Sequence, residues 1–162
     1  MTFLFSILPL FSIAYQDFKQ RAISWYWPVL LFGVSAFSGW NLYGAEMLKN
    51  VVFNLVFLVI LFSIVTIYFS LKAKKLNNIF DVFIGWGDVV FLLALVPFFH
   101  PLDFVLFYTF STILALMAAL VLKGKEIPYA GILSALMITA FALGLITDTT
   151  WLINLQFKSL LF

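Results

Sequence analysis

Six apolar runs separated by short polar breaks dominate the chain. Each run is long enough, or nearly so, to form a helix across about 30 Å of hydrocarbon at 1.5 Å per residue. The breaks contain Asn, Gly and Pro, which are typical of turns. The pattern predicts an all-α, polytopic membrane protein: a single membrane-embedded domain over residues 1–162 that forms a six-transmembrane-helix bundle. The spans are expected at residues 2–16, 23–40, 45–71, 84–99, 102–122 and 128–146, followed by an interfacial tail at residues 151–162.

The composition excludes most classes of water-soluble protein. Hydrophobic residues make up 65% of the chain and charged residues 10%, whereas about 25% of a soluble domain is charged. Membrane lipid, and not nucleic acid, is therefore the expected partner of most of the surface. The chain has no cysteine and one histidine, His100, which excludes disulfides, thiolate nucleophiles and Cys/His zinc sites. Accordingly, we expect neither a metal nor a cofactor.

The basic residues predict the orientation, because Lys and Arg accumulate in cytoplasmic loops. They follow the odd-numbered runs: Lys19 and Arg21 after the first, Lys72, Lys74 and Lys75 after the third, Lys123 and Lys125 after the fifth. The opposite side holds only Lys49 and Lys158. We therefore expect a multi-pass protein of the cytoplasmic (inner) membrane with both termini outside.

Two acidic residues lie at the cytoplasmic ends of apolar runs, where a charge costs roughly 2.5 to 3.5 kcal/mol. Asp17 ends the first run, roughly 23 Å from its outer start, and Asp88 lies about 17 Å from the outer end of the fourth. The two residues should therefore lie at similar depth, near the cytoplasmic face. We expect the two side chains to meet, and we expect a function to explain why the chain retains two charges that are unfavourable in the membrane.

Paired carboxylates can hydrolyse a peptide bond without a metal or a covalent nucleophile. At about 3 Å they share one proton, so one group takes a proton from water while the other gives one to the substrate. Gly85 and Gly87 precede Asp88 and allow a substrate backbone to approach closely. A purely structural interpretation stays open, in which Asp88 caps the fourth helix and Gly87 relieves strain there.

Three stretches resemble the type IV prepilin peptidases and preflagellin peptidases, a family of GxGD-type membrane aspartic proteases. They are Asp17-Phe18-Lys19-Gln20-Arg21-Ala22-Ile23, Gly85-Trp86-Gly87-Asp88 and Lys125-Glu126-Ile127-Pro128-Tyr129-Ala130. Two positions depart from the family pattern: Ser24 replaces a usual proline, and Val90 replaces a frequent lysine. The chain is similar to a short form without the methyltransferase region, which implies that any N-methylation of the product is carried out by another enzyme.

The resemblance implies an aspartic endopeptidase with Asp17 and Asp88 as catalytic residues. Its partner would be a type IV prepilin or pseudopilin precursor, whose short basic leader is cut after a glycine at the cytoplasmic face, before a hydrophobic helix. Pro128 and Tyr129 would shape the site at the start of the last span. Glu126 would attract the leader, or else be a solvated loop charge. Lys19 and Arg21 would help to bind substrate, although anchoring in the cytoplasmic loop also explains them.

Two other functions stay open. A small proton or cation transporter, or a channel subunit, would use the same intramembrane carboxylates, since such residues also mark ion pathways. An inactive, family-like assembly subunit would use neither. Asn substitution of Asp17 or Asp88 separates the three, because only a peptidase loses cleavage and only a transporter loses flux.

Overall fold

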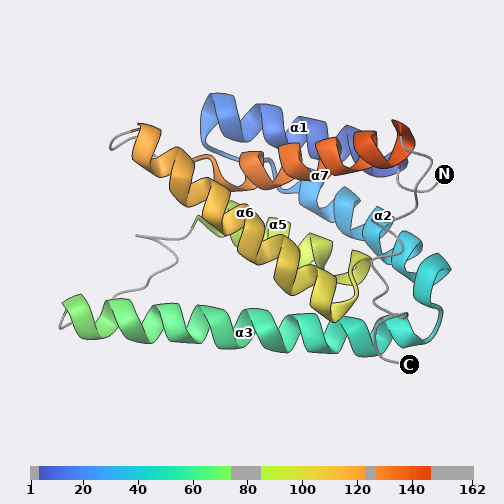
Figure 1. Ribbon diagram of the computed structural model, residues 1–162, viewed down its shortest axis with the longest axis horizontal. Helices are drawn as coiled ribbons and strands as arrows, with labels where there is room; N and C mark the ends of the chain where they lie inside the picture. The colour runs from blue at the N-terminus through green and yellow to red at the C-terminus, as the bar shows by residue number, and fades with distance from the viewer. Residues whose placement is uncertain (1–3, 74–84, 123–126, 147–162) are drawn as a thin grey trace.

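The computed structural model describes residues 4–73, 85–122 and 127–146, and these residues form helices joined by short connections (Figure 1). The elements are α1 Leu4–Gln20, α2 Tyr26–Tyr43, α3 Glu46–Ala73, α5 Trp86–Leu95, the 3₁₀ helix η1 Val96–Phe98, α6 Pro101–Leu122 and α7 Tyr129–Ile146. The predicted all-α class is confirmed. The tail expected at residues 151–162 lies outside the described residues.

Two of these helices, α3 and α6, contain stretches long and apolar enough to cross a membrane: Glu46–Tyr68 and Pro101–Leu120. The segment formed by α5 and η1, and helix α7, are apolar but shorter. The ten residues of α5 cover only about 15 Å. Beyond them Pro97 has no N–H with which to continue the α-helix, and the chain passes into η1. The expected span at 84–99 is thus a short helix with a tighter final turn.

Helix α5 lies at the centre of the packed part of the molecule. It contacts α2 and α7, while α1 packs along α7 and α3 runs along the opposite edge against η1, α2 and α6 (Figure 1). Helices α1 and α7 run in opposite directions. The largest fully buried apolar side chains come from six helices: Leu10, Ile13, Leu31, Leu58, Phe91, Leu95, Phe104 and Leu133. Helix α5 is therefore held in place on several sides.

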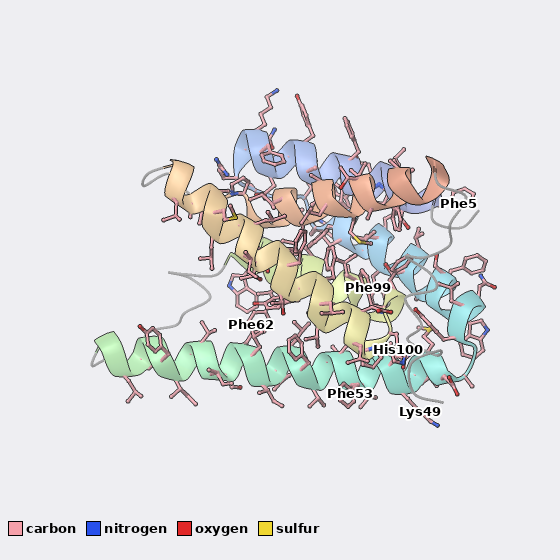
Figure 2. All side chains as sticks on the ribbon, in the orientation of Figure 1. Phe5, Lys49, Phe53, Phe62, Phe99 and His100 are labelled. Carbon is pink, nitrogen blue, oxygen red and sulfur yellow. The ribbon has the colours of Figure 1, made fainter. Side chains whose placement is uncertain are left out.

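Large apolar side chains cover the outside of the bundle, and small polar ones lie within it. Phe5 on α1 is 71% exposed and Phe53 on α3 is 64% exposed (Figure 2). The buried polar residues include Ser6, Ser35, Ser38, Asn54, Ser111 and Ser134. Such extensive exposed apolar surface is unusual for a protein in water, and small polar residues between helices are typical of packing in lipid. The distribution favours association with a membrane.

Asn54 fastens α3 to the end of the central helix. Its side chain is buried, and Nδ2 donates to the Val96 carbonyl at 3.1 Å and to the Phe99 carbonyl at 3.0 Å. These carbonyls follow the last regular turn of α5, where intrahelical donors run out. The amide therefore supplies partners that the backbone lacks there.

We expect Asn54→Ala to lower the free energy of unfolding by about 2 kcal/mol, because one buried and one partly buried carbonyl would lose their donor. Asn41→Ala is the matched control, since the exposed Asn41 side chain donates only to Phe37 of its own helix and should cost less than about 0.5 kcal/mol. Thermal unfolding in detergent, followed by circular dichroism, compares the two. Equal losses would contradict the assigned role of Asn54.

Candidate active site

Asp17 lies in the last turn of α1, at the end of the first apolar run. The helix continues four residues beyond the predicted end at residue 16 and stops where Arg21 adopts a left-handed φ of 53°. The Arg21 N–H closes this end by donating to the Asp17 carbonyl at 3.1 Å. The Asp17 side chain points inward and is only 7% exposed. A buried carboxylate in such a place needs hydrogen-bond donors.

Asp88 lies in the first turn of α5. Gly85 precedes the helix in an extended conformation, with φ −63° and ψ 133°, and its carbonyl accepts the Asp88 N–H at 2.9 Å. The Asp88 side chain is partly buried. An acidic residue in the first helical turn interacts favourably with the positive end of the helix dipole. The local sequence therefore suits a carboxylate at this point.

Helix α7 joins the two carboxylates through successive backbone amides. The Ala130 N–H donates to Asp88 Oδ1 at 3.0 Å, and the Gly131 N–H donates to Asp17 Oδ2 at 2.6 Å. The first amides of a helix have no intrahelical acceptor and favour anions. The two carboxyl groups also interact electrostatically with each other. The structure thus brings together Asp17 and Asp88, which are 71 residues apart in the chain.

The two glycines before Asp88 have different surroundings. A Cβ atom on Gly87 would lie 3.2 Å from Ile23 Cδ1, so the absence of a side chain lets the connection between α1 and α2 pack against α5. A Cβ atom on Gly85 would lie 3.3 Å from Asp88 Oδ2, the oxygen that the α7 amide does not engage. Gly85 therefore leaves space beside the Asp88 oxygen that the α7 amide does not bind.

The remaining predicted site residues are only partly gathered here. Lys19 is exposed and donates to the Tyr15 hydroxyl at 2.8 Å on its own helix, and Arg21 is exposed but acts electrostatically on Asp17. Pro128 is buried immediately before α7, and the Tyr129 hydroxyl pairs with Thr112 at 3.0 Å. Tyr129 also interacts electrostatically with Asp88. Glu126 lies outside the described residues.

The sequence interpretation did not identify Ala130 and Gly131 as parts of the site, although their amides hold both acids. A signal was present in the chain. Pro128 predicts the start of a helix, and the small residues Ala130 and Gly131 follow in its first turn, where free N–H groups are available. Only the fold shows that α1 and α5 direct their carboxylates at this turn.

Carboxylates dominate the chemistry available at this end of the bundle. Within the described ranges, no group of three or more His, Cys, Asp or Glu residues is placed to hold a metal ion. One oxygen of each aspartate accepts a hydrogen bond from a backbone amide of α7. The other oxygen, Asp17 Oδ1 or Asp88 Oδ2, does not bond to either of these amides. Comparisons of the chain with protein-family models, curated proteins and solved structures found no match.

Proposed function

We propose that the chain is a membrane aspartic endopeptidase of the prepilin peptidase type, with Asp17 and Asp88 as its catalytic pair. The observation that carries the proposal is the convergence of both carboxylates on successive amides of α7. Two acids from different helices are held at one place by a third helix, as the shared-proton chemistry of an aspartic peptidase requires. The GxGD stretch and the Ile-Pro-Tyr stretch supply two of the three helix ends at that place.

In the proposed reaction the pair holds one proton and activates one water molecule. The ionised carboxylate takes a proton from the water as its oxygen attacks the scissile carbonyl carbon, and the protonated partner gives its proton to the carbonyl oxygen. The resulting gem-diol then breaks down: the protonated carboxyl group gives its proton to the leaving amine as the C–N bond breaks, and the other carboxylate takes a proton from one hydroxyl of the diol as the C=O bond forms. Water is the only co-reactant, and the pair returns to its single-proton state.

The proposed placement has the six helices crossing the cytoplasmic membrane with the aspartate pair at the cytoplasmic face. It is supported by the outward apolar side chains and by Lys19 and Arg21, which follow Asp17 at the end of α1, while Lys49 lies near the start of α3 at the other end of the bundle (Figure 2). In this orientation a precursor keeps its hydrophobic helix in lipid while its leader reaches the two acids.

The test is cleavage of a purified prepilin-like substrate, with a basic leader that ends in glycine before an apolar helix, by the purified protein in lipid. We expect a single cut after the glycine, located by mass spectrometry. A substrate with the leader glycine replaced by leucine is the matched control and should remain uncut. If several leaders stay intact, the peptidase proposal fails, and proton or cation flux through reconstituted protein becomes the function to measure.

A further inference from the structure

We propose that Gly131 is the positioning residue that holds the Asp17 carboxylate in its productive orientation, an inference that rests on the proposed peptidase function. Gly131 contributes in two ways. Its N–H donates to Asp17 Oδ2 at 2.6 Å, the shorter of the two bonds from α7 to the pair. Its lack of a side chain lets the carboxylate approach the helix closely enough to accept that bond.

The space around Gly131 is filled by the catalytic acid and its neighbour. A Cβ atom built there would lie 3.1 Å from Asp17 Oδ2 and 3.2 Å from the Phe18 ring atoms Cδ2 and Cε2. Both distances are below ordinary van der Waals contact. By contrast Ala130, one residue earlier, carries a fully buried methyl group while its N–H donates to Asp88. Of the two α7 residues whose amides hold the pair, only the one that binds Asp17 is a glycine.

The consequence is a fixed assignment of oxygens on Asp17. Because Oδ2 is held by the Gly131 amide, Oδ1 is the atom left for the shared proton and the water. A side chain at 131 would push the carboxylate by a few tenths of an ångström or rotate it away from the amide. Misplacement of a catalytic group by about 1 Å costs about 100-fold in rate, so a shift of a few tenths of an ångström should cost roughly 3- to 10-fold.

Gly131→Ala is therefore expected to lower kcat by about 3- to 10-fold with little change in KM, because the substrate still binds but the acid is displaced. Phe18 offers a way to separate this effect from simple crowding. Its ring is half exposed, so Phe18→Ala should fold, and it removes the second contact of the new methyl group. In the Phe18→Ala background, adding Gly131→Ala should still lower kcat by a similar factor.

The experiment compares wild type, Gly131→Ala, Phe18→Ala and the double variant on the same prepilin-like substrate, with thermal unfolding of each. Gly33→Ala is the control for adding a methyl group to a helical glycine, because nothing lies within 4 Å of a Cβ atom there. If wild type cuts but Gly131→Ala keeps the wild-type kcat, the inference is overturned. It is equally overturned if the double variant regains the kcat of Phe18→Ala, since Gly131 would then only avoid the ring. An inert wild type overturns the proposed function itself.

Discussion

Replacing either Asp17 or Asp88 by Asn is expected to lower the rate of precursor cleavage by at least about 10³-fold. An Asn side chain neither takes a proton from water nor delivers one to the substrate, and each of these steps typically contributes about 10² to 10⁴ in rate. The fold should persist, because the amide oxygen of Asn can still accept the α7 N–H that now bonds each carboxylate. Cleavage kinetics and thermal unfolding of the purified variants check both halves of this expectation.

The two substitutions should also be strongly non-additive. In the proposed mechanism the pair acts as one unit that shares a proton, so the double variant is expected to be about as inactive as either single variant. Asp103→Asn is the matched control, since Asp103 lies in the first turn of α6, beside His100 at the opposite end of the bundle (Figure 2). It should retain wild-type kcat within about twofold.

Three outcomes distinguish the candidate functions. Loss of cleavage in both single variants with normal unfolding supports the peptidase. Residual cleavage near the wild-type rate in either variant removes that residue from the chemistry and with it the two-aspartate mechanism. Loss of proton or cation flux, in a protein that never cleaves a precursor, would instead assign the carboxylates to an ion pathway.

The helices themselves were predictable from the chain because each apolar run had to satisfy its backbone hydrogen bonds internally. Their ends were less predictable. Helix α1 continues to Gln20 because nothing before Arg21 interrupts the hydrogen-bond ladder, so charged residues beyond the apolar run are helical. Helix α5 stops at Leu95 although the apolar run continues to Phe99, because Pro97 has no N–H with which to continue the helix. The hydropathy pattern does not register this missing donor.

The two acidic residues of the site could also be anticipated from the sequence. The cost of a buried charge singled out Asp17 and Asp88 and suggested that they meet. What lay beyond the sequence was the donor: the amides of Ala130 and Gly131 carry no side-chain signature, and any helix beginning offers such groups. Which helix start faces the acids is decided by the packing of α1 along α7, a long-range contact that no local pattern contains.

Gly39→Ala is expected to be the most destabilising single-methyl change in the described part of the chain. Gly39 is buried on α2, where a Cβ atom would fall on the Pro97 carbonyl oxygen and 3.4 Å from Met47. The obstacle is backbone, so no side-chain rotation relieves it, and α2 must move away from η1. Overpacking of this kind costs about 3 kcal/mol, which corresponds to a lower thermal midpoint by about 6 to 12 °C for a chain of this size.

Gly33→Ala on the same helix is the matched control for the change in backbone freedom. No atom lies within 4 Å of a Cβ atom at Gly33, so alanine there should raise the free energy of unfolding by about 0.5 to 1 kcal/mol through its higher helix propensity. The two variants should therefore move the thermal midpoint in opposite directions. Equal shifts would mean that α2 and η1 are not in backbone contact. Since η1 continues directly from α5, that result would also remove one of the contacts that hold Asp88 in place.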